Sequence, residues 1–395
     1  MAQVLAGIRV LDFGRFIAAP WCSAILADMG ADVIRVEKRE GGEDRWVQPV
    51  ARSGEGATFL QCNRNKRSLT LDSTTPEGAE ITRRLVAGAD VVIANMPEAA
   101  MRANGLDYPS LKAVKPDIIL ASATAFGVGG PYSERVGFDG VGQVMSGGVY
   151  RSGTPEHPMR CATPYVDFST ALTLAIGTMM ALYHRLATGE GQQVEAALLP
   201  TALMMTNAMV IEQALLKPDR VAMGNKGVAV APCDLFRCRD DQWILVQVAG
   251  QPMFRRWCRL MGEESWFTDP RFASDDLRSV NETMLNAKMS DWCLARSQAE
   301  AMTELDTARV PASPLFSPQN VLDDPHVKAM GFLRPLPYPG TPAAAPVIET
   351  PFRLSATPGA VRTRAPLLGE HTDDVMAELG YADPEIAGLR ARGII

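Results

Sequence analysis

Apolar segments of strand length alternate with amphipathic segments over the first two hundred residues of the chain. Short apolar runs occur at 8–13, 32–37, 68–72, 90–95 and 116–122, and the segments between them carry apolar residues at helical spacing. Continuous apolar strands that alternate with helices predict a parallel sheet covered by helices on both faces. Right-handed crossovers between such strands give a Rossmann-like, doubly wound α/β domain.

Local signals support several of these helices. Pro20 stands where a first helical turn is predicted, and Thr75 precedes Pro76 and Glu77, which is typical of a helix start. The segment 40–66 interrupts the alternation, because it is polar and rich in Gly and Arg. We expect it to form a long surface loop at the carboxyl end of a strand, where open α/β sheets bind ligands.

The pattern changes in the second half of the chain. A glycine-rich segment, 124–166, leads into an apolar helical stretch at 168–186, followed by a strand at 193–198 and a Met-rich helix at 201–216. Two strands joined by a turn are predicted within 231–246, helices at 253–261, 282–294 and 372–379, and a Pro- and Ala-rich linker at 333–346. We therefore predict a discontinuous large domain, residues 1–216 and 331–395, and a smaller mixed α/β domain, residues 217–330.

Composition narrows the function classes. The chain has 395 residues, 47% of them hydrophobic and 21% charged, and its net charge is −6. These values suit a soluble globular protein, and the absence of a basic stripe argues against nucleic acid as a partner. The N-terminus does not have the pattern of a signal peptide, and the run at 168–186 is shorter than the ~20 residues of a bilayer span. We expect a cytoplasmic protein without a membrane partner.

Common cofactor and metal motifs are missing from the sequence. The seven cysteines include no C-x-x-C pair and the four histidines are far apart, so we expect reduced thiols and no metal site. Residues 127–131 read G-V-G-G-P, which departs from the dinucleotide fingerprint and favours a plain glycine turn. The phosphate-binding loop of nucleotide triphosphatases and the serine nucleophile elbow are also absent.

Two aspartates, Asp139 and Asp167, flank the end of the glycine-rich segment. Asp167 directly precedes the apolar helix, where an aspartate is a favoured N-cap. The helix dipole would also hold its carboxylate ionised, which suits a nucleophile that needs no general base. Spacing alone does not separate a cap from a catalytic residue.

Four basic residues, Lys38, Arg39, Lys66 and Arg67, lie at strand ends. Basic side chains in such places are usually solvated surface charges. Their position near the ligand edge of the predicted sheet also makes them candidates for phosphate contact.

Several phrases match one protein family in order along nearly the whole chain. They are L-A-G-I-R-V-L-D from Leu5, G-A-D-V-I-R-V-E-K from Gly30, N-K-R-S-L-T-L-D from Asn65, G-P-Y from Gly130, G-F-D from Gly137, T-G-E-G-Q from Thr188, D-P-R-F from Asp269 and P-L-L-G-E-H-T-D from Pro366. The sequence resembles the class III CoA-transferases, the group that contains formyl-CoA transferase, carnitine CoA-transferase and the α-methylacyl-CoA racemases.

The resemblance implies an interlocked homodimer, in which a large Rossmann-like domain is built from both chain ends. It implies that Asp167 attacks an acyl-CoA thioester and that an aspartyl anhydride and an aspartyl-CoA thioester follow. Coenzyme A would be a substrate, and the resemblance implies no tightly bound cofactor. The positions that match the family's CoA contacts are Ile17, Ala18, Lys38, Leu71, Asp72, Ser73, Thr74, Asn95, Met96, Arg102, which stands one place from the family's arginine, Arg135 and Phe138.

Two departures from the family pattern bear on the reaction. Phe138 stands where the racemases carry a histidine, and a phenylalanine cannot move a proton. Ile17 replaces a glutamine of formyl-CoA transferase, and only Gly224-Asn-Lys-Gly227 is comparable to its polyglycine lid, which argues against formate or oxalate specificity. We expect transfer of CoA from an acyl-CoA to a carboxylic acid. The alternatives are an acyl-CoA racemase or CoA-transferring isomerase and a non-catalytic acyl-CoA-binding protein.

Overall fold

The computed structural model describes residues 3–395, and the chain divides into two compact units. The larger unit contains the N-terminal segment up to Gly148 together with Cys161–Lys217 and Lys328–Ile395. The smaller unit contains Val149–Arg160 and Pro218–Val327. The division into domains of residues 1–216 with 331–395 and 217–330 stays a prediction.

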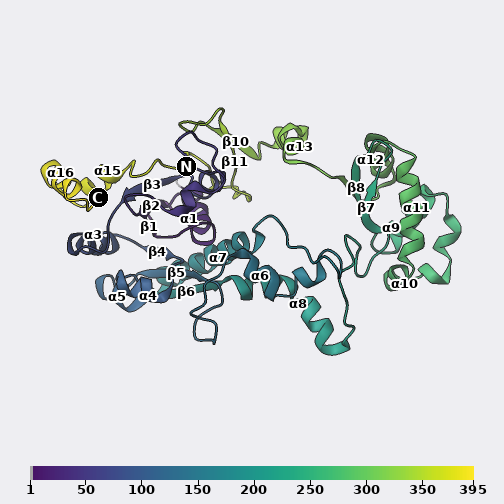
Figure 1. The fold of residues 1–395 in the computed structure, drawn as a ribbon, viewed down its shortest axis with the longest axis horizontal. Helices are drawn as coiled ribbons and strands as arrows, with labels where there is room; N and C mark the ends of the chain where they lie inside the picture. Colours follow the sequence, from purple (N-terminus) through teal and green to yellow (C-terminus); the bar gives the residue numbers. More distant parts are fainter. Residues whose placement is uncertain (1–2) are drawn as a thin grey trace. The chain divides into compact units, whose positions relative to one another are not determined.

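A six-stranded parallel sheet forms the centre of the larger unit (Figure 1). Its strands are β1 (Arg9–Asp12), β2 (Asp32–Glu37), β3 (Lys66–Thr70), β4 (Val91–Ala94), β5 (Ile119–Thr124) and β6 (Gln193–Ala197). They lie in the order β3-β2-β1-β4-β5-β6, and all their pairings are parallel. The predicted α/β class and doubly wound sheet are thereby confirmed. The strand order reverses between β1 and β4, which is where such sheets form a ligand crevice.

Helices cover both faces of the sheet because successive strand residues point to opposite sides. On one face, Val10 of β1 contributes to a core with α1 (Ala18–Asp28) and α7 (Tyr165–Thr188). On the other face, Leu11 contributes to a core with α3 (Pro76–Ala87), α5 (Tyr108–Val114), α15 (Thr372–Glu378) and α16 (Asp383–Ala391). Figure 1 shows the two C-terminal helices on the same side of the unit as α3.

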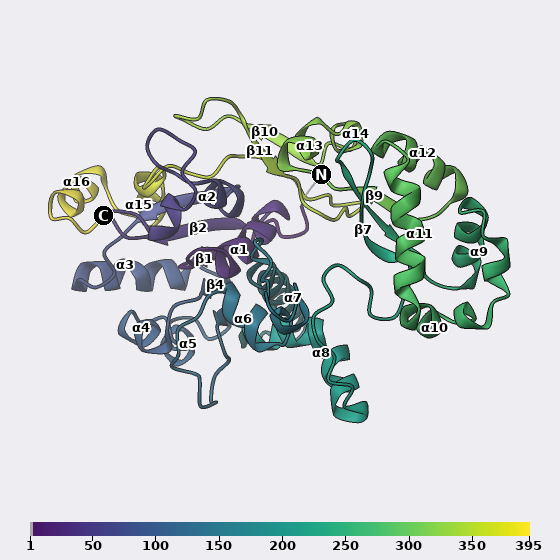
Figure 2. The ribbon, with the colours of Figure 1, turned by 45° about the vertical axis from the view of Figure 1, so that its right-hand side comes forward.

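The remaining elements of this unit surround the sheet. They are η1 (Glu43–Trp46), α2 (Ala57–Cys62), α4 (Glu98–Ala103), α6 (Asp139–Met145), α8 (Leu198–Leu216), β10 (Leu333–Leu336) and β11 (Ala345–Ile348). The predicted linker at 333–346 is wrong, because its two ends pair as the antiparallel strands β10 and β11 (Figure 2). Val347, packed with Leu336, gives this hairpin a small core of its own.

The predicted surface loop at 40–66 is also wrong in part. It contains α2, and its residues Asp44 and Arg45 are buried beneath the sheet edge. Arg45 donates two hydrogen bonds to Glu37, and Arg35 pairs with both Glu37 and Asp44. Sequence composition suggested solvent-exposed arginines, but these guanidinium groups are almost wholly enclosed and paired with carboxylates.

Helix α7 is longer and less buried than the sequence indicates. It runs for 24 residues, and by length and apolar composition it is the one helix within residues 3–395 that could cross a membrane. One side packs on α1 and on β5 and β6, through residues such as Leu174 and Thr178. The other side is exposed, with Ile176, Met180 and Tyr183 open to solvent. The buried side is what we expect of a helix that packs on the central sheet of a globular protein.

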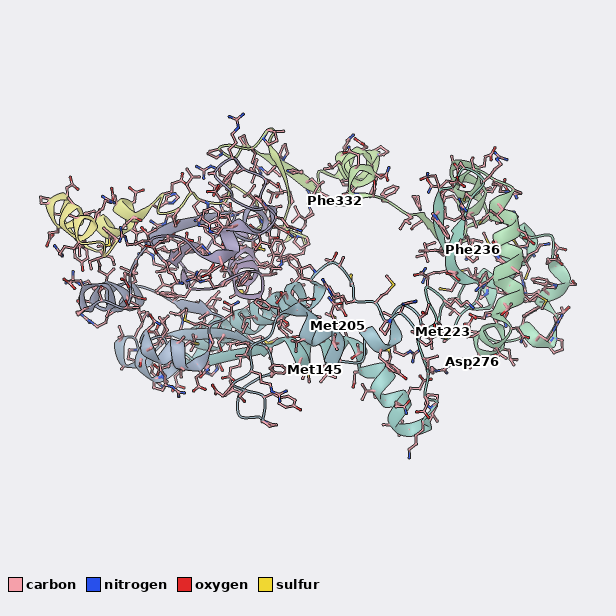
Figure 3. All side chains as sticks on the ribbon, in the orientation of Figure 1. Met145, Met205, Met223, Phe236, Asp276 and Phe332 are labelled. Carbon is pink, nitrogen blue, oxygen red and sulfur yellow. The ribbon has the colours of Figure 1, made fainter. Side chains whose placement is uncertain are left out.

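The smaller unit combines a three-stranded antiparallel sheet with helices. Its strands are β7 (Cys233–Arg237), β8 (Trp243–Gln247) and β9 (Ala312–Pro314), and β7 and β8 form the predicted pair joined by a turn. Its helices are η2 (Val149–Arg151), α9 (Gln251–Leu260), η3 (Glu264–Phe267), η4 (Pro270–Phe272), α10 (Asp275–Val280), α11 (Glu282–Leu294), α12 (Gln298–Ala308), α13 (Pro318–Asp323) and the first half of α14 (Pro325–Met330). Phe236 lies in its core with Trp257 (Figure 3).

Candidate functional site

The loops that follow strands β1 to β4 enclose a cavity of about 540 Å³ at the carboxyl edge of the sheet. Its lining residues follow one strand after another and are Phe13, Arg15, Val36, Glu37, Lys38, Arg39, Glu40, Glu43, Leu71, Asp72, Ser73, Thr74, Met96, Asn104 and Leu106. Six positions that the family resemblance marks as ligand contacts, Lys38, Leu71–Thr74 and Met96, are thus brought to one cavity. Their contact with CoA stays a prediction.

Arg15, Lys38 and Arg39 give this cavity a set of cationic groups. Glu43 is close to two of them, at 3.7 Å from Arg15 and 3.6 Å from Lys38. The Nη1 atom of Arg15 is buried, and among residues 3–395 it has no hydrogen-bond partner. An anionic ligand in the cavity would supply an acceptor for it. Arg15 is not among the residues predicted from the sequence, although its place three residues after the end of β1 is a usable signal.

Asn95 joins the two loops at the point where the strand order reverses. Its Oδ1 accepts from the backbone N–H of Arg15 at 2.8 Å, and its Nδ2 donates to the Arg15 carbonyl at 2.8 Å. Both polar atoms of the side chain are therefore engaged by the backbone of the β1 loop. Asn95 thus ties the loop after β4 to the loop after β1, and its contact with CoA stays a prediction.

The other predicted contact residues lie outside the cavity wall. Ile17 and Ala18 are buried at the start of α1, in the core beneath the sheet edge. Arg102 is exposed and pairs with Glu98 one helical turn away, at 2.8 Å. Arg135 places its guanidinium group 3.9 Å from the centre of the Tyr132 ring. For these residues the role in CoA binding stays a prediction.

Lys66 and Arg67 do not lie on an open ligand surface. Lys66 is buried, and its Nζ donates to the Asp12 carboxylate at 2.7 Å and to the Pro20 carbonyl at 2.8 Å. Burial lowers the pKa of Lys66, and the charge of Asp12 opposes that change. Arg67 pairs with Asp32 and Glu378. The interpretation of Lys66 as a solvated charge or a phosphate contact is therefore wrong.

The second part of the site surrounds Asp167. This residue is the third of α7 and not its N-cap, because the helix begins two residues earlier, after Pro164. The backbone N–H groups of Val166 and Asp167 donate to Oδ1 of Asp139, at 2.8 and 3.1 Å. Asp139 is the first residue of α6, and its side chain therefore caps the N-terminus of α7, a different helix.

The protonation of Asp167 also differs from the sequence-based expectation. Burial, and after it the charge of Asp139, raise the pKa of the Asp167 carboxyl from 3.8 to about 7. We expected the helix dipole to hold this group ionised, but removal from water and a neighbouring like charge outweigh the dipole. A carboxylate with this pKa is a stronger base and a less solvated nucleophile than an ordinary aspartate.

Two aromatic side chains connect the cavity to the aspartate pair. The ring of Phe16, in the loop that also carries Arg15, meets the ring of Phe138 edge to face, with centroids 5.4 Å apart. Phe138 directly precedes Asp139 and is largely exposed. On the far side of Asp167, Phe168 packs edge to face on Trp21 of α1, with centroids 5.3 Å apart. The start of α7 is thus held next to the β1 loop.

Among residues 3–395, no group of three or more His, Cys, Asp or Glu side chains is arranged to hold a metal ion.

Comparison with known proteins gives a consistent result over nearly the whole chain. The family model described as CoA-transferase family III matches residues 5–372. A succinate–glutarate CoA-transferase from Agrobacterium fabrum is 34% identical over 95% of each chain. A succinyl-CoA–L-malate CoA-transferase beta subunit from Chloroflexus aurantiacus is 32% identical, covering 99% of this chain and 98% of the relative. The crystal structure of a CaiB/BaiF family protein from Brucella suis has a TM-score of 0.84 and 33% identity, covering 96% of this chain and all of the other.

Proposed function

The chain belongs to CoA-transferase family III and is a class III CoA-transferase, and from that premise we propose that it uses Asp167 as a nucleophile to move CoA from an acyl-CoA to a carboxylic acid. The observation that carries the proposal is the state of Asp167. Its carboxylate lies at the start of α7, largely removed from water, while the carboxylate of Asp139 caps the helix in its place.

The proposed reaction balances without a redox step or a net proton. An oxygen of Asp167 bonds to the thioester carbonyl carbon, and the C–S bond breaks to give CoA thiolate and an aspartyl anhydride. The thiolate then attacks the aspartyl carbonyl carbon, which releases the donor acid and leaves an aspartyl-CoA thioester. The acceptor carboxylate attacks that thioester, whose C–S bond breaks to release CoA thiolate and leave a second aspartyl anhydride. The thiolate then attacks the acceptor's carbonyl carbon in this anhydride, which forms the new acyl-CoA and releases Asp167 as a carboxylate.

The cavity at the carboxyl edge of the sheet supports a CoA site. Arg15, Lys38 and Arg39 offer positive charge for phosphate groups, and the Arg15 Nη1 atom lacks a hydrogen-bond partner among the described residues. Phe16, next to the cavity residue Arg15, contacts Phe138, next to Asp139, so the loop after β1 links the cavity to the aspartate pair. We propose the cavity as the nucleotide end and Asp167 as the reacting end of one site.

The names of the relatives suggest a class of acids. The two relatives described above are named for succinate with glutarate and for succinyl-CoA with L-malate, and all of these acids are short dicarboxylates. We propose succinyl-CoA as donor and a dicarboxylic acid of four or five carbons as acceptor. A panel of mono- and dicarboxylates tested with succinyl-CoA, with free CoA esters separated by chromatography, identifies the acceptor.

We also propose that the protein is a cytoplasmic homodimer whose chains interlock. The exposed side of α7 presents Ile176, Met180 and Tyr183, and α8 presents Ile211 and Leu215. Met145 of α6 and Met205 of α8, both labelled in Figure 3, are also exposed. A monomer seldom leaves so large an apolar surface uncovered, and a second copy of the chain is the partner that would cover it.

An oxygen label tests the proposed mechanism directly. Each turnover carries one oxygen from the acceptor carboxylate to Asp167 and one oxygen from Asp167 to the released donor acid. With an ¹⁸O-labelled acceptor, mass spectrometry should therefore find label first in the Asp167 peptide and later in the donor acid. A non-catalytic acyl-CoA-binding protein would transfer no label, and a racemase would instead exchange the substrate α-hydrogen with deuterium. Full activity of Asp167→Ala would overturn the assignment.

A further inference from the structure

Helix α7 begins without a capping side chain of its own. Its N-cap residue is Pro164, which makes no side-chain cap, and the first-turn N–H groups need an acceptor. Oδ1 of Asp139 accepts from both Val166 and Asp167, at 2.8 and 3.1 Å. Asp139 is buried, so these two bonds are shielded from water and fix where the backbone of Asp167 lies.

Gln143, one turn further along α6, holds the second oxygen of Asp139. Its Nε2 donates to Asp139 Oδ2 and to the Cys161 carbonyl, the latter at 3.3 Å. Its Oε1 accepts from the Cys161 N–H at 2.9 Å, so the amide also clamps the segment that leads into α7. Gln143 is 1% exposed, and α6 is fixed in turn to α8 by a bond from Thr206 to the Ser146 carbonyl at 2.9 Å.

The Asp167 carboxylate is left out of this network. Within residues 3–395 it receives no hydrogen bond, while its own backbone N–H is held by Asp139. We propose that Asp139 and Gln143 are positioning residues, which cap α7 in place of Asp167 and aim its carboxylate at the thioester. This inference rests on the proposed function, since it assigns a partner to the proposed nucleophile.

The same arrangement puts a negative charge beside Asp167. The titratable groups that act with Asp167 are Asp139 on α6 and Cys62 at the end of α2, and Tyr165 and Cys161 lie around Asp139 itself. After burial, Asp139 is the charged group that acts on Asp167. Removal of that charge should lower the pKa at which Asp167 becomes reactive, while removal of the hydrogen bonds should misplace it.

Three variants separate these effects. Asp139→Ala removes both the acceptor and the charge, and Gln143→Ala removes the clamp on Asp139. Asp139→Asn keeps an Oδ1 acceptor for the two N–H groups but removes the charge, and its amide nitrogen replaces the Oδ2 acceptor of Gln143. The measurements are kcat, KM for succinyl-CoA and the pH dependence of kcat/KM, with Ser297→Ala, a cap on α12 of the smaller unit, as the matched control for the loss of a helix cap.

We expect Asp139→Ala to lower kcat about 100-fold, with KM changed by less than about threefold, because a displaced nucleophile loses reaction geometry rather than substrate binding. Gln143→Ala should lower kcat about tenfold by the same route. Asp139→Asn should recover much of the rate lost in the alanine variant and should move the acid limb of the profile to lower pH.

The proposal is overturned if all three variants keep a kcat within about twofold of the wild type while Asp167→Ala is inactive, because a misplaced nucleophile would have cost far more. It is overturned equally if the variants raise KM and leave kcat unchanged. Activity of Asp167→Ala would instead overturn the proposed function. If Asp139→Ala does not fold, Gln143→Ala and the asparagine variant decide between the outcomes.

Discussion

Replacement of Asp167 by asparagine should abolish transfer and at the same time stabilise the folded protein. The wild-type carboxyl has its pKa raised from 3.8 to about 7. An acid whose pKa is higher in the folded state than in the unfolded state weakens folding once it must ionise. Asparagine has the same shape and no charge, so the variant avoids that penalty.

The size of the gain follows from the pKa interval. At 1.36 kcal/mol per pH unit, the interval from 3.8 to about 7 gives ~4 kcal/mol as an upper figure. Asp167 is partly exposed, and screening by water reduces the expected gain to about 2–3 kcal/mol. The sign follows from proton binding: below pH 4 the group is protonated in both states and the gain is small. It grows between pH 4 and 7 and is constant above pH 7.

The assay is urea unfolding of wild type and Asp167→Asn at pH 4.5, 6 and 8, at fixed protein concentration. Trp21, which packs on Phe168 directly after Asp167, reports on this region by its fluorescence. As a control, Asp276→Asn removes an exposed carboxylate from α10 of the smaller unit (Figure 3) and should give no comparable gain. A stability difference that is independent of pH, or a variant less stable than the wild type at pH 8, would refute the reasoning.

Three further predictions concern other parts of the molecule. Lys66→Met should lower the free energy of unfolding by about 3–5 kcal/mol, measured by urea unfolding at pH 7, because it leaves the buried Asp12 carboxylate without its cation. Lys38→Ala should raise KM for the acyl-CoA several-fold and leave kcat nearly unchanged, because Lys38 lines the cavity and Asp167 does not. An altered kcat at constant KM would contradict this prediction. Leu215→Asp should dissociate the proposed dimer in analytical ultracentrifugation, whereas an unchanged mass would exclude the exposed side of α8 from the interface.

The parallel sheet could be predicted from the sequence because the pattern of apolar residues along a strand depends directly on which of its faces are buried. Val10 and Leu11 face opposite cores, and such alternation within short apolar runs predicts a sheet with two covered faces. Asp167 is visible in the sequence as an aspartate next to a long apolar helix, but only the family resemblance, and not its spacing, predicts that it is the nucleophile. Its contact with the reacting groups stays a prediction, as does the list of CoA contacts.

The surroundings of Asp167 could not be predicted from spacing. Its cap comes from Asp139, 28 residues earlier, and a contact across that distance leaves no periodic signal. The prediction for Lys66 was wrong for a related reason. Its partner Asp12 is 54 residues away, so local sequence could not show the ion pair, and a lysine without a visible partner is predicted to be a surface charge. The hairpin of β10 and β11 was missed because prolines at its edge resemble a linker. In each case a tertiary contact outweighed the local signal.

The reversal of strand order between β1 and β4 has a consequence for how this protein could diversify. The cavity wall comes from the loops after β1 to β4, whereas Asp139 and Asp167 both belong to the crossover from β5 to β6. The cavity proposed to bind the nucleotide end of CoA and the proposed reaction centre at Asp167 therefore come from separate stretches of the sequence. Mutations in the crossover, away from the predicted CoA contacts Arg135 and Phe138, can alter which acid is accepted while the cavity wall keeps its sequence, so a new specificity can arise by local change.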